Sequence, residues 1–226
     1  MFTHTAWLIL RKDLTVEFRS REIVYTAFFF AVACVLVFAF AFVREGRPPE
    51  GAAAAVLWVA ILFSGNLALA RTFERERQSE TLRALLLAPV ARTALYVGKL
   101  LGIMAMLAII ELMLVPLVAF LFQEEHIFRH PFWLAAIVLA GTAGFSAVGT
   151  LFAAMLVRVR ARDMLLPLLL YTITVPVIIA GVQGTSVLLQ PEVDFGVVRF
   201  WLLLLICFDV VFVTLALWTF DALMAE

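Results

Sequence analysis

FERERQSETLRALLLAP, residues 73–89, lies between two apolar stretches that are each long enough to cross a membrane. The segment begins with alternating charges, turns apolar, and ends at a proline, which cannot donate the hydrogen bond that a continuing helix needs. Leu82, Leu85 and Leu86 recur at the spacing of one helical face, so the pattern predicts a short amphipathic helix over residues 74–88. Such a helix cannot cross a bilayer, and it must lie against lipid headgroups or against a soluble partner.

The composition around this segment is that of a membrane protein. The chain has 226 residues, of which 65% are hydrophobic and 21 are phenylalanine, and its mean hydropathy is +1.07. A soluble domain is about half apolar and could not bury this much apolar surface. The formal net charge is zero, which gives no support for nucleic-acid binding. We therefore expect an all-α polytopic membrane protein with a single transmembrane domain.

Six apolar segments have the length of a membrane span. Their approximate bounds are 23–43, 52–70, 94–122, 132–157, 164–182 and 198–220. A lipoprotein-like processing site at Cys34 is the alternative for the first segment, but the apolar run continues past it to Val43, which favours a retained span. Residues 5–22 place Trp7 and Phe18 on one helical face among charged residues, which predicts a helix in the interface plane or one packed on protein.

Lys and Arg residues predict the orientation of these spans. Of the 17 Lys and Arg residues, all but four lie in the N-terminal segment, at or near the 74–88 segment, or in the turn after the fourth span. The four on the other side are Arg44, Arg47, Arg129 and Arg199. The positive-inside rule therefore predicts that both termini and the charged helix are cytoplasmic.

The chain carries no motif for chemistry of its own. Residues 144–150, GFSAVGT, have the glycine spacing of a phosphate-binding loop but lack its lysine and lie within a predicted span. We interpret these glycines, and the Gly98–Gly102 pair, as helix-packing positions. No catalytic residue and no metal site is predicted. Energy for any transport work must then arrive from another subunit, and the charged helix is the expected point of contact.

A few polar residues within or beside the spans are candidates for function. Glu111 and Asp209 fall near the middle of the third and sixth spans, where a carboxyl belongs either to an intramembrane polar path or to a tie between helices. His126 and His130 could face a haem or metal ion, or simply lie in a wet loop. Tryptophans fall at or near predicted span ends, as expected of interface anchors, at positions Trp7, Trp58, Trp133, Trp201 and Trp218.

Several motifs in order along the chain resemble those of the haem exporter protein B family of cytochrome c maturation permeases. The matching stretches are Lys12–Glu22, Trp58–Ser64 (WVAILFS), Arg71–Glu76 (RTFERE), Leu82–Pro89 (LRALLLAP) and Leu165–Gly181. One departure is at Ser79-Glu80, where the family often has Asp-Gly. Glycine would bend the helix whereas Glu80 favours its continuation, so the departure concerns the local shape of the segment.

This resemblance implies an ABC-2-type exporter permease in the bacterial plasma (inner) membrane. Its expected partners are two copies of a cytoplasmic ATPase subunit, a second copy of itself, a haem-handling membrane protein, a small single-span subunit and a haem chaperone. ATP and Mg²⁺ would bind the ATPase subunit, and haem would be handled by the complex, with no cofactor bound by this chain. ATP hydrolysis would drive haem delivery, or release of haem-loaded chaperone, on the outer side.

In this interpretation the 74–88 helix is the coupling helix. Its leucine ridge would sit in a cleft of the ATPase, and its charges would set the register at the rim. The predicted coupling residues are Glu74, Arg75, Glu76, Arg77, Glu80, Leu82, Leu85 and Leu86. The alternatives are a permease of the same architecture that exports lipid, glycan or drug, and a non-transport membrane scaffold or intramembrane enzyme.

Overall fold

The computed structural model of the chain describes residues 2–42, 49–78, 92–156, 159 and 161–223. All regular structure within these residues is helical. The helices are α1 (Phe2–Ser20), α2 (Glu22–Phe42), α3 (Ala52–Gln78), α5 (Arg92–Phe122), α6 (Pro131–Met155), α7 (Arg162–Leu188) and α8 (Phe195–Leu223). The six from α2 onward are long and apolar enough to cross a membrane, which confirms the predicted polytopic α-helical class.

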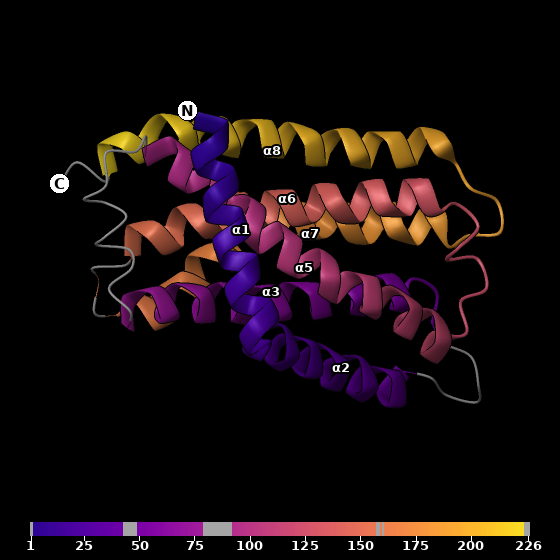
Figure 1. The fold of residues 1–226 in the computed structure, drawn as a ribbon. Helices are drawn as coiled ribbons and strands as arrows, with labels where there is room; N and C mark the ends of the chain where they lie inside the picture. The colour runs from indigo at the N-terminus through magenta and orange to yellow at the C-terminus, as the bar shows by residue number, and fades with distance from the viewer. Residues whose placement is uncertain (1, 43–48, 79–91, 157–158, 160, 224–226) are drawn as a thin grey trace.

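The six long helices run lengthwise through the molecule, and α1 lies across them (Figure 1). The end of α3, the start of α5 and the end of α8 gather at one end of the bundle, on the left in Figure 1. The α5–α6 and α7–α8 connections lie at the opposite end. This alternation places the charged last turns of α3 and the end of α8 at the same end of the bundle, which we call the α1 end.

The centre of the bundle is formed mainly by α3 and α6. Of the most apolar 18 residues in each helix, 72% are buried in α6 and 61% in α3, but only 11% in α8. Glycines allow this close packing, since a Cβ on Gly144 would lie 3.1 Å from the Phe208 ring of α8, and one on Gly149 would overlap Leu69 of α3. The interpretation of the GFSAVGT segment as a packing motif is thus confirmed for both of its glycines.

Trp58 does not anchor the protein at the membrane interface, contrary to our expectation. Its side chain is buried, with 3% of the residue exposed, and its indole N–H donates a hydrogen bond to Thr185 Oγ1 at 3.0 Å. The ring lies against the backbones of Gly141 and Gly181, where a methyl group on either glycine would overlap it. Because neither glycine has a side chain, the Trp58 ring fits into a slot between α6 and α7. The ring thereby joins α3 to both helices.

Two helices extend further than their apolar stretches predicted. We expected the second span to end near Ala70 and the fifth near Val182, whereas α3 runs to Gln78 and α7 to Leu188. Most of the added residues are polar, and hydropathy alone marks only the part of a helix that lies in hydrocarbon. Residues 74–78 therefore continue α3 and do not begin a separate helix. The rest of the predicted 74–88 helix lies outside the described residues.

Candidate functional site

The helix α1 presents its acidic residues to the protein and its large apolar residues to the outside. Its buried side is a stripe at helical spacing that packs chiefly on α5 and consists of Ala6, Ile9, Asp13 and Glu17. The apolar face predicted from Trp7 and Phe18 lies on the opposite side, where these two residues are exposed. α1 is therefore packed on protein through one face and has an outward face suited to an interface with lipid.

Glu17 joins three helices at the α1 end of the bundle. One carboxylate oxygen accepts a hydrogen bond from the backbone N–H of Val24, in the first turn of α2, at 2.9 Å. The other oxygen pairs with the Arg75 guanidinium, in the last turn of α3, at 3.1 Å. Arg75 also donates to Ser20 at 3.1 Å and lies 3.4 Å from the Glu22 carboxylate. The end of α3 is thereby held to the elbow between α1 and α2.

A second ion pair fastens α1 to α5. The Lys99 ammonium lies 2.7 Å from Asp13, and both residues are buried, with 3% and 9% of their surface exposed. Lys12 lies 2.9 Å from the other carboxylate oxygen of Asp13 but is itself more exposed. A buried carboxylate requires such partners, because burial of an unpaired charge is costly.

The Gly98–Gly102 pair lies beneath α1. A Cβ on Gly98 would come within 2.8 Å of Ile9 Cβ and 3.0 Å of the Ala6 carbonyl oxygen. On Gly102 the nearest contact would be Asp13 at 3.5 Å, an ordinary separation. The packing interpretation is thus confirmed for Gly98, on which α1 directly rests.

We expect Gly98→Ala to loosen α1 and to lower the free energy of unfolding by about 1–3 kcal/mol, as overpacking of a tight contact does. Gly102→Ala is the matched control on the same helix, with an expected change below about 1 kcal/mol, because its Cβ would meet Asp13 only at an ordinary van der Waals distance. Thermal unfolding of both variants in mild detergent measures the difference. Equal effects of the two substitutions would contradict the close contact at Gly98.

Among the predicted coupling residues, the structure describes the side chains of Glu74 and Arg75 alone. Both lie near the end of α3, and Arg75 is bound to Glu17 as described above. Glu76 and Arg77 belong to the last residues of α3, and only their backbone is described. The remaining members, Glu80, Leu82, Leu85 and Leu86, lie outside the described residues.

The two intramembrane carboxyls are not brought together. Glu111 of α5 is buried, and one of its oxygens accepts a hydrogen bond from the Thr142 hydroxyl of α6. Asp209 of α8 lies against Gly144 of α6, where a Cβ would come within 2.6 Å of its Oδ1. Because Thr142 and Gly144 are two positions apart on a helix, they point to different sides of α6. Glu111 thus ties α5 to α6, whereas Asp209 belongs to the contact between α6 and α8.

Both carboxyls retain an oxygen without a hydrogen-bond partner among the described residues. These atoms are Glu111 Oε2 and Asp209 Oδ1. An unpaired polar atom at membrane depth is expensive and is characteristic of a functional or water-filled position. The intramembrane path through Glu111 and Asp209 remains a prediction, and any such path has two branches separated by α6.

At the opposite end of the bundle a hollow of about 830 Å³ is lined by residues from three connections, including Glu50, Glu124, His126 and Glu192. Partial burial raises the pKa of the Glu124 carboxyl, an effect that His126 partly offsets. His130 instead packs edge-on against the ring of Phe195, 5.1 Å between centroids. The described residues contain no group of three His, Cys, Asp or Glu side chains suited to a metal ion.

The roles of Asp13, Glu17 and Lys99 were not predicted from the sequence. The signal was present for α1, since Ala6, Ile9, Asp13 and Glu17 recur at helical spacing opposite the apolar face. Their partners follow far later in the chain, 58 residues on for Glu17 and 86 for Asp13. Pairings of that separation depend on the tertiary arrangement, and no local pattern in this sequence indicates them.

Comparison with known proteins gives one consistent result. The family model described as CcmB protein matches residues 4–225. The chain is similar to Heme exporter protein B of Rhodobacter capsulatus, with 27% identity over 176 residues, which cover 77% of this chain and 79% of that protein. It is also similar to Heme exporter protein B of Escherichia coli K12, with 34% identity over 97 residues, 42% of this chain and 44% of that protein.

The match extends over all six spans, α1 and the segment that follows α3. This match agrees with the resemblance to the same family that was indicated by several motifs, taken in order along the sequence. This six-span membrane protein, with its N-terminal helix fastened to α3 and α5 by ion pairs, belongs to the CcmB protein family.

Proposed function

We propose that this chain is the permease subunit of an ABC-type complex for cytochrome c maturation. In this complex, ATP hydrolysis by a separate subunit would drive haem delivery, or release of a haem-loaded chaperone, on the outer side of the membrane. The observation that carries the proposal is the family match over residues 4–225, together with relatives named Heme exporter protein B. The chain itself would catalyse no reaction.

The proposed orientation has both termini and the α1 end of the bundle in the cytoplasm of a bacterium, at its inner membrane. The Lys and Arg distribution supports it, since Arg11, Arg19, Arg75 and Lys99 all belong to the α1 end. The segment after α3 would then face the ATPase subunit. Two copies of that subunit would pair with two copies of this chain, alongside a haem-handling membrane protein, a small single-span subunit and a haem chaperone.

Arg75 gives the coupling hypothesis a physical basis. The coupling segment leaves α3 directly after the turn that Arg75 holds to Glu17, Ser20 and Glu22. A displacement of that segment by the ATPase would therefore act on α3 and on the elbow between α1 and α2 together. The end of α3 could move without the elbow only if the bonds from Arg75 to Glu17, Ser20 and Glu22 were broken first.

A stain for covalently attached haem tests the proposed function. We expect membranes of a strain that lacks the gene to lose c-type cytochromes while b-type haems and ATP levels remain normal, and the intact gene to restore them. The strain must have no second cytochrome c maturation pathway. Normal c-type cytochromes in the deletion strain would overturn the proposal and would favour export of a lipid, glycan or drug.

Leu82→Asp is expected to abolish co-purification of the ATPase subunit and to leave membrane insertion intact. The substitution places a charge in the centre of the predicted leucine ridge, where docking would bury it. Leu87→Asp is the matched control, because Leu87 lies off the stripe formed by Leu82, Leu85 and Leu86. If the Leu82→Asp chain still purifies with a full complement of ATPase, the docking assignment is wrong.

Arg75→Gln separates coupling from docking. We expect this variant to keep the ATPase subunit bound, because the leucine ridge is unchanged, but to support less cytochrome c formation. Glutamine retains a donor for Glu17 and loses the charge that binds Glu22 as well. Haem staining of strains that carry the variant, with ATPase co-purification as the control, measures the two properties separately.

A further inference from the structure

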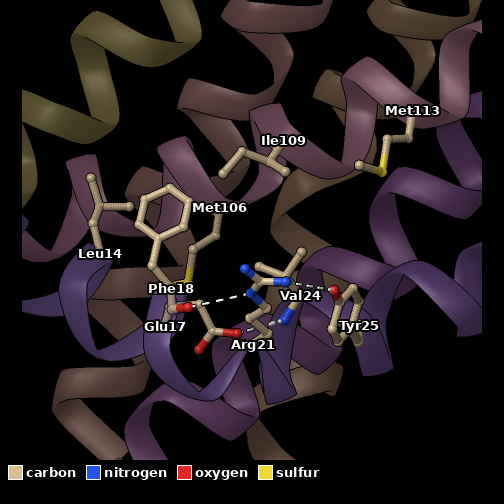
Figure 2. Close-up of a pocket in the computed structure, with 9 residues that line it drawn as sticks. All are labelled: Leu14, Glu17, Phe18, Arg21, Val24, Tyr25, Met106, Ile109 and Met113. Atoms are coloured by element: carbon tan, nitrogen blue, oxygen red, sulfur yellow. Dashed lines mark hydrogen bonds between the residues drawn. The ribbon is translucent and has the colours of Figure 1, made fainter.

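An apolar groove of about 200 Å³ opens at the elbow between α1 and α2, against the side of α5. Figure 2 shows its nine lining residues, Leu14, Glu17, Phe18, Arg21, Val24, Tyr25, Met106, Ile109 and Met113. All but Glu17 and Arg21 are apolar or aromatic. The groove is therefore a hydrophobic slot with its charged groups confined to the elbow.

Glu17, the acidic residue that lines the groove, is already paired with donors from the protein. The two oxygens of Glu17 are occupied by the Val24 N–H at 2.9 Å and by the Arg75 guanidinium at 3.1 Å. This carboxylate consequently offers no strong acceptor to a further cation and little repulsion to an anion. Among the residues that line the groove, Arg21 is then the one whose charge is available to a ligand.

Arg21 is exposed and weakly held. Its Nε donates to the Phe18 carbonyl oxygen at 3.4 Å and its Nη1 to the Tyr25 hydroxyl at 3.3 Å, both long for such bonds. No carboxylate lies within ion-pair distance of it in the part of the chain that the structure describes. A guanidinium has five N–H donors, so several of them remain available to a ligand beside the Tyr25 hydroxyl.

The position of the elbow decides which ligand can reach this group. Glu22 begins the first membrane span, and α1 before it turns its exposed Phe18 outward. The elbow is therefore at the depth of lipid headgroups, and the groove beside Met106, Ile109 and Met113 continues along α5 toward the hydrocarbon. A molecule that fits both parts has an anionic headgroup and an acyl chain.

We infer that this groove is a binding site for one anionic phospholipid. The phosphate would bind the Arg21 guanidinium and the Tyr25 hydroxyl, and one acyl chain would lie in the slot formed by α1, α2 and α5. Arginine binds phosphate through two parallel hydrogen bonds, which makes it well suited to this role. A zwitterionic phospholipid carries the same phosphate with an ammonium group that partly cancels its attraction, so the site prefers a headgroup of net negative charge.

Native mass spectrometry of the purified full-length chain tests the site. The detergent-purified chain is titrated with dioleoyl phosphatidylglycerol and, separately, with dioleoyl phosphatidylethanolamine, which share the same acyl chains. We expect the first phosphatidylglycerol to bind about tenfold more tightly, because the ammonium group of phosphatidylethanolamine partly cancels the attraction of the shared phosphate to Arg21. Arg21→Gln should remove this preference and Arg21→Lys should retain part of it. Because Arg21 is exposed, neither substitution disturbs the core.

Arg19→Gln is the matched control, since Arg19 is exposed in the last turn of α1, two residues before Arg21, but does not line the groove. We expect it to leave the preference unchanged, whereas Ile109→Trp, which fills the slot, should weaken binding of both lipids. Equal weakening by Arg21→Gln and Arg19→Gln would mean attraction to surface charge in general and would overturn the proposal. Unchanged lipid binding by a folded Ile109→Trp chain would overturn it equally.

Discussion

Asp13→Leu is expected to lower the free energy of unfolding by about 3–5 kcal/mol, because it leaves a buried ammonium without its carboxylate. Lys99 is 3% exposed, and its Nζ lies 2.7 Å from Asp13. The Lys99 side chain stays buried as long as α1 remains docked on α5. We therefore expect α1 to detach in this variant before the spans themselves separate.

Three variants measured by steric trapping or by thermal unfolding in mild detergent distinguish this interpretation. The double variant Asp13→Leu with Lys99→Leu should recover most of the loss, since a buried ion pair can often be replaced by apolar residues at little cost. Lys12→Gln, which removes the more exposed partner of Asp13 at 2.9 Å, should cost about 1 kcal/mol or less. An Asp13→Leu chain as stable as the Lys12→Gln chain would show that the pair does not hold α1.

Trp58→Ala should destabilise the bundle by about 3–5 kcal/mol, the usual cost of removing a large buried aromatic side chain. The indole fills the slot between Gly141 and Gly181 and donates to Thr185 at 3.0 Å. Removing it leaves a cavity between α3, α6 and α7 that rigid helices cannot close, and it leaves the Thr185 hydroxyl without this partner.

Trp218→Ala is the matched control for this substitution, because Trp218 is 85% exposed on α8. We expect it to change the unfolding free energy by less than about 0.5 kcal/mol. Gly181→Ala alone should also be destabilising, and Trp58→Ala should relieve much of that effect by making room for the methyl group. Additive effects of Gly181→Ala and Trp58→Ala would contradict the direct contact between them.

The spans could be predicted from the sequence because hydropathy reports directly on which segments lie in hydrocarbon. It does not report where a helix ends once it leaves that layer. Residues 71–78 are polar apart from Phe73 and still helical in α3, and polar Thr185 near the end of α7 is buried against Trp58. The predicted bounds were therefore too short where polar residues continue a helix.

The candidate site could be predicted only in part. Glu111 and Asp209 stand out as carboxyls in apolar runs, yet their neighbours Thr142 and Gly144 lie on another helix and carry no signal of the contact. Trp58 was misassigned as an interface anchor because its position near a span end says nothing about whether it points inward. Glu74 and Arg75 were chosen for their charge, but the bond from Arg75 to Glu17 depends on the packing of α1.

The separation along the chain between α1 and its partners has a consequence for biosynthesis. Glu17 is made 58 residues before Arg75, and Asp13 is made 86 residues before Lys99. While the ribosome is still completing α3 and α5, α1 lacks both of these counter-ions. Helix α1 can thus reach its final position only after α3 and α5 have been made.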